Sequence, residues 1–147
     1  MNCKVGNIQI ASLPEPRVEW LPDNRQMELV EPYEICFYLG REYFHAYIPE
    51  GFVFDGASIP RFAWATTGSP FVGAHRKPAL VHDAIYSGKR GEIFDVQTGE
   101  RIKMTRKQAD DALLSGCIFE GQDWYTRNKI YSAVRLFGGG MFQDGKG

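Results

Sequence analysis

The 147-residue sequence predicts a single α+β domain, in which an N-terminal antiparallel β-sheet precedes a three-helix C-terminal part with an inserted β-hairpin. Three observations predict this class. Residues 1–48 contain short alternating, β-branched and aromatic stretches, which are typical of strands. Apolar residues at helical spacing appear only after residue 75, in three segments. The length suits one domain, and 44% hydrophobic with 14% aromatic residues is a globular composition.

The β-rich part is expected to span residues 1–48. Its clearest feature is a hairpin of residues 34–39 and 42–48, because a short Gly40-Arg41 connection joins two aromatic and β-branched stretches. His45 is expected to be a partly exposed residue of this hairpin. Further candidate strands are residues 5–10, 17–20 and 26–30. Prolines interrupt the sequence between the first two candidates, since proline cannot donate to a sheet ladder.

Residues 49–73 are expected to form a long loop. Asp55-Gly56 is a turn-forming pair, so Asp55 is interpreted as a turn residue in preference to a ligand. Ser58 is expected to cap a short helical turn. The backbone carbonyls of the turn-rich passage 66–70 would be free to meet water or an ion.

Residues 74–138 are expected to form the helical part, and residues 139–147 a tail. The first helix is predicted to begin at Arg76 or Lys77 and to end at Gly88. A β-hairpin is predicted over residues 92–104, where two apolar stretches flank a turn.

The other two helices have clear N-terminal signals. Thr105 and Gln108 match a capping box, so a helix is predicted from there to about Phe119. Asp123 is predicted to cap the third helix. Its expected core-facing stripe consists of Trp124, Ile130, Tyr131, Val134 and Phe137. This helix also carries three basic residues, Arg127, Lys129 and Arg135. We interpret them as a solvated face in preference to a binding patch.

Composition argues against several functional classes. The formal net charge of -1 is not that of a general nucleic-acid binder, so no nucleic-acid partner is expected. No apolar run approaches the roughly 20 residues of a transmembrane segment, and residues 1–7 have no apolar signal core. The three scattered cysteines fit a reducing cytosol. P-loop, GxSxG and GxGxxG motifs are absent from the sequence.

The candidate site is centred on the sequence HDAIY at residues 82–86. His82 and Tyr86 share one face of the first helix, whereas Asp83 is rotated by about 100°. If the first two helices pack antiparallel, Asp110 can reach the far ring nitrogen of His82, and Tyr86 can hold the same carboxylate. His82 is then a candidate general base, and His82, Asp110 and Tyr86 are the candidate catalytic residues.

Other interpretations of these residues stay open. Asp83 would be left to bind a hard cation together with loop carbonyls, which is the environment that calcium prefers. A zinc site of His75, His82 and Asp83 is an alternative. The same side chains also suit a buried polar network that fixes helix packing. The neighbouring Asp111 is expected to face solvent or to cap backbone groups.

Four segments resemble a family of uncharacterised proteins from tailed bacteriophages and prophages. They are residues 51–61 (GFVFDGASIPR), 78–86 (PALVHDAIY), 106–110 (RKQAD) and 131–138 (YSAVRLFG). The resemblance implies a phage origin, with synthesis in the host cytoplasm and a place in the virion as a further possibility. The family carries no agreed activity.

The order H-D-x-x-Y followed by A-D on a second helix is also similar to the core of secretory and parvoviral phospholipases. This resemblance implies that His82 activates a water, that Asp83 binds calcium, and that Asp110 orients His82 with help from Tyr86. By position, Gly68 of the Thr67-Gly68-Ser69 passage is the nearest counterpart of the calcium loop. The disulfides of the secretory enzymes and a clear glycine-rich calcium loop are missing from this sequence.

We therefore expect a phage-encoded hydrolase with a His82–Asp110 dyad, calcium-assisted and acting on an ester such as a bacterial envelope lipid. The alternative is a non-catalytic virion or assembly protein whose N-terminal aromatic residues meet other phage structural proteins. A cytosolic inhibitor of host defence is a third class, for which the sequence offers no signature.

Overall fold

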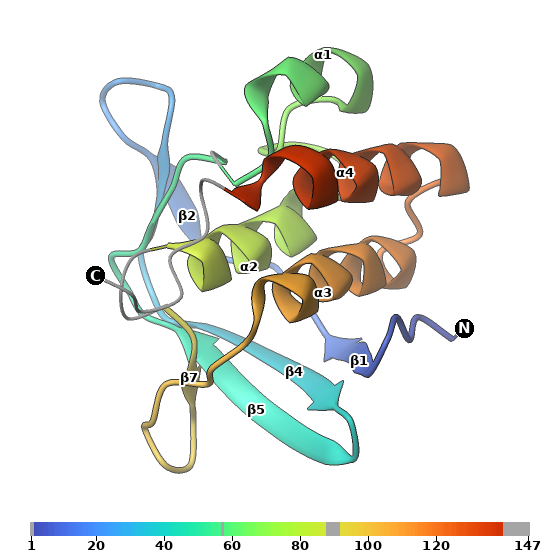
Figure 1. Ribbon diagram of the computed structural model, residues 1–147. Helices are drawn as coiled ribbons and strands as arrows, with labels where there is room; N and C mark the ends of the chain where they lie inside the picture. The colour runs from blue at the N-terminus through green and yellow to red at the C-terminus, as the bar shows by residue number, and fades with distance from the viewer. Residues whose placement is uncertain (1, 57, 88–91, 140–147) are drawn as a thin grey trace.

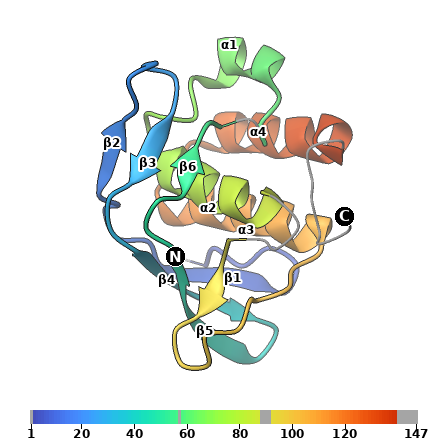
Figure 2. The same ribbon diagram turned by 90° about the vertical axis from the view of Figure 1, so that its left-hand side faces the viewer.

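The computed structural model of the chain describes residues 2–56, 58–87 and 92–139, and it confirms the α+β class (Figure 1). The predicted N-terminal sheet is in fact two antiparallel sheets. The larger has the order β1-β4-β5-β7, and its strands are Ile8–Ser12, Tyr33–Leu39, Glu42–Ile48 and Phe94–Asp95. The smaller has the order β2-β3-β6, and its strands are Val18–Trp20, Met27–Leu29 and Val53–Phe54 (Figure 2).

The predicted hairpin of β4 and β5 is present in full register, from Tyr33 opposite Ile48 to Leu39 opposite Glu42. The inserted hairpin is also confirmed, although only β7 is a regular strand. Its turn is closed by the Asp95 amide, which donates to the Glu100 carbonyl at 2.8 Å. Because β7 pairs with β5, the insertion extends the large sheet by one strand.

The loop between the sheets and the helices has more structure than predicted. It contains β6, the 3₁₀ helix Arg61–Ala63 and the short helix α1 at Trp64–Thr67. The prediction that Ser58 caps the helical turn is wrong. Pro60 is the residue that precedes the turn, and it makes no side-chain capping bond. The Ser58 hydroxyl is directed instead to the candidate site.

The three predicted helices are present as α2 Arg76–Tyr86, α3 Arg106–Phe119 and α4 Trp124–Phe137. The predicted capping box of α3 is confirmed, since the Thr105 hydroxyl accepts from the Gln108 amide and the Gln108 side chain accepts from the Thr105 amide. Asp123 caps α4 as predicted, by accepting from the Thr126 amide at 2.8 Å. The predicted helix end at Gly88 lies outside the described residues, and so does the predicted tail of residues 139–147 except for Gly139.

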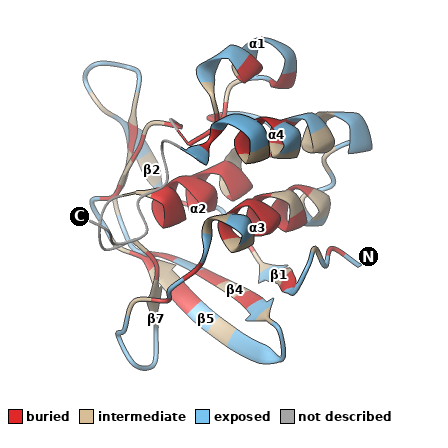
Figure 3. Ribbon diagram, in the orientation of Figure 1, coloured by how far each residue is buried: buried red, intermediate tan, exposed pale blue. Residues whose placement is uncertain are grey.

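Helix α2 is the centre of the molecule. Every residue from Pro78 to Tyr86 is buried, whereas α4 keeps one exposed face (Figure 3). Helix α3 packs against α2, α4 and β1. It approaches α2 closely at Gly116, where a Cβ atom would lie 2.9 Å from the Pro78 ring. Any polar side chain on the middle of α2 therefore needs a partner from within the protein, since water cannot reach it.

The predicted core stripe of α4 is only partly correct. Ile130 and Val134 are fully buried, but Trp124 is 66% exposed and Phe137 is 59% exposed. The Phe137 ring lies against the exposed Phe62 ring, with 5.0 Å between the centroids. Among the residues that the structure describes, no helix is long and apolar enough to span a membrane.

Candidate functional site

The candidate site is a chain of hydrogen bonds that passes through the His82 ring. Its Nε2 lies 2.7 Å from Asp110 Oδ1, and its Nδ1 lies 2.9 Å from the Ser58 hydroxyl. Helix α2 supplies the imidazole, α3 the carboxylate, and the segment after β6 the hydroxyl. His82 and Asp110 are 0% exposed and Ser58 is 2% exposed. The structure thus joins a hydroxyl, an imidazole and a carboxylate in one line.

Asp110 is the most heavily bonded member of the site. Oδ1 also accepts the Tyr86 hydroxyl at 2.5 Å, and Oδ2 accepts from the Arg135 guanidinium at 2.7 Å. The predicted contacts of Asp110 with His82 and Tyr86 are therefore present. The expectation that Arg135 belongs only to a solvated face is wrong, because its guanidinium reaches from α4 to a fully buried carboxylate.

The protonation states follow from these contacts. Burial lowers the pKa of His82, and the Asp110 carboxylate only partly offsets this. Burial alone would raise the pKa of Asp110, but hydrogen bonds from His82, Tyr86 and Arg135 bring it below its usual value. At neutral pH the pair is therefore a neutral imidazole beside a carboxylate. The carboxylate accepts from Nε2–H, so Nδ1 carries the lone pair and the Ser58 hydroxyl donates to it.

Asp83 lies on the other side of the Ser58 segment. Its Oδ1 accepts the Ser58 backbone amide at 3.2 Å, and the side chain is 6% exposed. Burial raises the pKa of Asp83 to about 7, and the nearby Asp55 charge adds to the increase. Asp83 therefore holds the backbone of Ser58 in place and also contacts its hydroxyl, which His82 binds as well.

Gly68 lies in a different environment from Asp83. Its amide donates to the Trp64 carbonyl at 2.9 Å, its carbonyl faces the Thr67 hydroxyl, and its Cα lies near the His75 ring. The His75 ring contacts the Ser69 carbonyl and the Gln122 side chain, at 2.9 and 3.3 Å. Within the described part of the chain, no three His, Cys, Asp or Glu side chains are placed to hold a metal ion. Calcium binding by Asp83 and Gly68 stays a prediction.

The prediction that Asp111 faces solvent or caps backbone groups is wrong. The residue is only 3% exposed. Its carboxylate accepts the Tyr131 hydroxyl at 2.6 Å and pairs with Lys107 at 2.8 Å. Asp110 and Asp111 are thus two adjacent buried carboxylates, each bonded to a tyrosine and to a basic residue. Only Asp110 bonds to a histidine, which makes Asp111 a matched reference for it.

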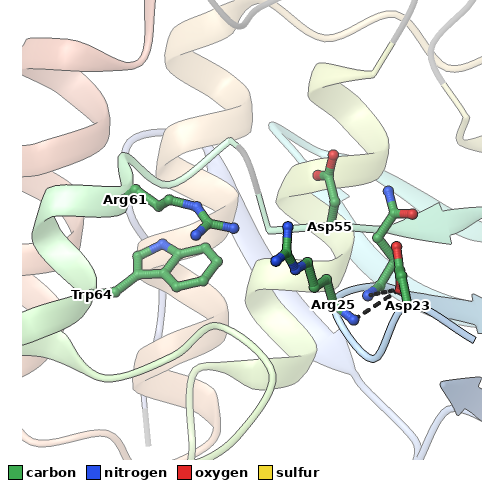
Figure 4. A pocket seen from close by; sticks show the side chains of 6 residues that line it. Asp23, Arg25, Asp55, Arg61 and Trp64 are labelled. Atoms are coloured by element: carbon green, nitrogen blue, oxygen red, sulfur yellow. Dashed lines mark hydrogen bonds between the residues drawn. The ribbon is translucent and has the colours of Figure 1, made fainter. Parts of the chain in front are cut away.

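A pocket of about 300 Å³ is lined by residues between β2 and β3 and by Asp55, Arg61 and Trp64 (Figure 4). Asp55 and Arg61 line it, three residues before and three residues after Ser58. The guanidinium groups of Arg25 and Arg61 face the same space, and Arg61 lies over the Trp64 ring at 4.9 Å. The carboxylates of Asp23 and Asp55 line the same pocket, so two acidic side chains accompany the two guanidinium groups.

Two members of the site were missed at the sequence level. The sequence predicts a helix cap at Ser58 and a solvated face at Arg135. The signal for Ser58 was the segment GFVFDGASIPR, one of the four that carry the phage-protein resemblance. No periodic pattern marks Arg135, because the α4 face that it shares is mostly exposed.

Comparison with known proteins gives two matches. The model of a family described as "Protein of unknown function (DUF1353)" matches residues 27–134. That range contains Ser58, His82 and Asp110. The "Uncharacterized protein y4jT" of Sinorhizobium fredii (strain NBRC 101917 / NGR234) is 29% identical over 100 residues. The match covers 63% of this chain and 30% of the relative, so the chain spans less than a third of that protein. No solved structure matches the chain.

Proposed function

Because the chain belongs to the DUF1353 family of proteins of unknown function, we propose its activity from its geometry: it is an ester hydrolase with a His82–Asp110 dyad. The observation that carries the proposal is the orientation of His82. Its Nε2 is held by Asp110 at 2.7 Å, and its Nδ1 lies 2.9 Å from an O–H group. This is the arrangement of a general base whose tautomer is fixed by a carboxylate.

In the proposed reaction His82 moves one proton. Nδ1 takes the proton of an attacking O–H group as that oxygen adds to the ester carbonyl. The imidazolium is stabilised by Asp110, which stays ionised because Tyr86 and Arg135 also bond to it. Nδ1 then returns the proton to the leaving alkoxide. The lowered pKa of His82 suits this task, since the ring is neutral and able to accept a proton at neutral pH.

The proposed substrate is an ester that also carries an anionic group, such as a phospholipid of the bacterial envelope. The two guanidinium groups of Arg25 and Arg61 support this choice, because guanidinium binds phosphate oxygens in pairs. The resemblance to phage proteins adds a biological setting, in which a phage or prophage product acts on its host. No step is assigned to calcium, because the described contacts of Asp83 are with Ser58 and Asp55, and those of Gly68 lie elsewhere.

The proposal is tested by fatty-acid release from phospholipid vesicles, with calcium and with chelator. We expect release that falls at least about 100-fold in His82→Ala, the smaller end of what a general base contributes. Circular dichroism establishes that the variant is folded, and His82→Gln serves as a second variant if it is not. Dependence on calcium would support Asp83 as a ligand. Activity that is unchanged in a folded His82 variant contradicts the dyad.

Burial favours a second candidate, a non-catalytic virion or assembly protein. His82 and Asp110 are fully buried, and all their described polar atoms have partners, as in a network that fixes helix packing. An aromatic pair on the large sheet, Tyr38 and Tyr43, is exposed at 40% and 55% and suits contact with another protein. Mass spectrometry of purified virions would find many copies per particle, and no ester would be hydrolysed.

A further inference from the structure

We propose that Ser58 is the nucleophile of this site, so that the reaction passes through an acyl-Ser58 intermediate; this inference rests on the proposed hydrolase function. The hydroxyl at Nδ1 of His82 occupies the position from which an activated O–H group must come. The alternative nucleophile, a water molecule, would have to displace it. The connectivity is that of a serine, histidine and aspartate triad, with the two ring nitrogens exchanged relative to the serine proteases.

Backbone bonds position the Ser58 segment. The Ser58 amide donates to Asp83, and the Ile59 amide donates to the Gly56 carbonyl. The Ser58 hydroxyl lies between two acceptors, the Asp83 carboxylate and His82 Nδ1. Because Nε2–H is donated to Asp110, Nδ1 is the acceptor in its contact with the hydroxyl, which is the direction of proton transfer that a serine nucleophile needs. Asp83 is a second acceptor for the same hydroxyl.

Ser58 lies in the sequence between two residues that line the pocket. Asp55 comes three positions before it and Arg61 three positions after it. Ser58 itself is 2% exposed and is not one of the lining residues.

The proposed reaction has two steps, acylation and deacylation of Ser58. The Ser58 oxygen forms a bond to the ester carbonyl carbon while its proton passes to His82 Nδ1. The bond between that carbon and the alcohol oxygen breaks, and the alcohol leaves with the proton from Nδ1. Water then adds to the acyl carbon and gives a proton to Nδ1. The bond between that carbon and the Ser58 oxygen breaks, the Ser58 oxygen takes the proton from Nδ1, and a carboxylic acid is released.

Labelling with an alkyl fluorophosphonate tests this directly, since it requires no knowledge of the substrate. The Ser58 oxygen bonds to phosphorus, fluoride leaves, and the proton passes to His82. We expect one adduct per chain by intact mass, mapped to Ser58 by peptide sequencing and lost in His82→Gln. Ser115 is the matched control, because it is a buried serine whose hydroxyl only accepts the Ile10 amide. A folded protein without an adduct at Ser58 overturns the proposal.

Ser58→Ala separates this inference from the proposed function. If Ser58 is the nucleophile, fatty-acid release falls at least about 1000-fold in Ser58→Ala and is unchanged in Ser115→Ala. If water attacks instead, Ser58→Ala opens room for it at Nδ1, and the variant keeps an activity that still requires His82. That second result would support the hydrolase function and contradict Ser58 as the nucleophile. If the wild-type protein releases no fatty acid from several lipids, both proposals are contradicted.

Discussion

At the scale of single residues, Asp83 shows how burial and neighbouring charge assign a role. It has the same amino-acid type as Asp110, but its pKa moves in the opposite direction. Asp110 accepts bonds from His82, Tyr86 and Arg135, which favour its charged form. Asp83 is buried near Asp55, and the bond from the Ser58 amide compensates only in part. One carboxylate is therefore kept ionised, and the other is kept close to its midpoint at neutral pH.

This difference predicts a change of stability with pH. The pKa of Asp83 rises from 3.8 when unfolded to about 7 when folded. Its contribution to stability is therefore fully present below pH 3.8 and is lost as the pH rises towards and through 7. In Asp83→Asn, whose amide oxygen still accepts the Ser58 amide, we expect that loss to disappear. Urea unfolding should show that the free energy of unfolding of the variant increases relative to that of the wild type between pH 5 and pH 8. The increase should be at most about 1.4 kcal/mol per pH unit.

Glu50→Gln is the control for that comparison, because it removes an exposed carboxylate. Its stability curve should stay parallel to that of the wild type. Parallel curves for Asp83→Asn as well would mean that Asp83 is ionised in the folded protein at pH 5, against the assignment made here.

At the scale of elements, helix α3 decides where Asp110 lies. The capping box at Thr105 fixes the first turn, and close packing at Gly116 fixes the distance from α2. Asp110 comes one turn after the cap and faces α2, whereas Asp111 faces Lys107, Tyr131 and the N-terminal segment at Gly6. A change in the rotation of α3 would exchange the environments of these two carboxylates.

We therefore expect Thr105→Ala to destabilise the protein by about 0.5–2 kcal/mol, since it removes a side-chain N-cap. The measurement is urea unfolding at pH 7. Ser132→Ala, on the exposed face of α4, should change the stability by no more than about 0.5 kcal/mol. Equal effects of the two substitutions would show that the capping box does not hold α3.

Periodicity and caps were sufficient to predict the long elements. The first residues of α3 and α4 follow Thr105 and Asp123 as predicted, because both caps are formed by local bonds within the first turn. The predicted cap at Ser58 failed, because its hydroxyl makes a tertiary contact with His82 instead. Strand β6 was missed because two residues show no period, and it forms only by pairing with Met27 and Glu28. The split into two sheets was missed for the same reason, since pairing between distant strands leaves no mark on either one.

At the scale of the whole molecule, the fold brings the segment after β6 and helix α3 to His82 of α2, and it brings α4 to Asp110. The sequence predicted the meeting of His82, Tyr86 and Asp110, because two of them share a helix face and the third begins the next helix. It did not predict Ser58 or Arg135, because their approach depends on how the segment after β6 and α4 pack on α2 and α3. Periodic patterns in the sequence do not predict contacts that depend only on tertiary packing.

The two candidate functions assign different roles to the contact between His82 and Asp110. In the structural protein the contact stabilises helix packing, and in the hydrolase it serves catalysis. Asp110 and Asp111 allow the two to be separated within one helix. Both are buried, and each accepts a tyrosine hydroxyl and a basic side chain, but only Asp110 touches His82. Replacing either one by asparagine should disturb packing to a similar extent.

The most direct measurement is therefore ester hydrolysis by Asp110→Asn beside Asp111→Asn, each at a matched folded fraction established by urea unfolding. The hydrolase account predicts similar losses of stability, with an activity that falls at least about 100-fold in Asp110→Asn only. Equal activities in the two variants, or no hydrolysis by the wild-type protein, would contradict it and would favour the structural network.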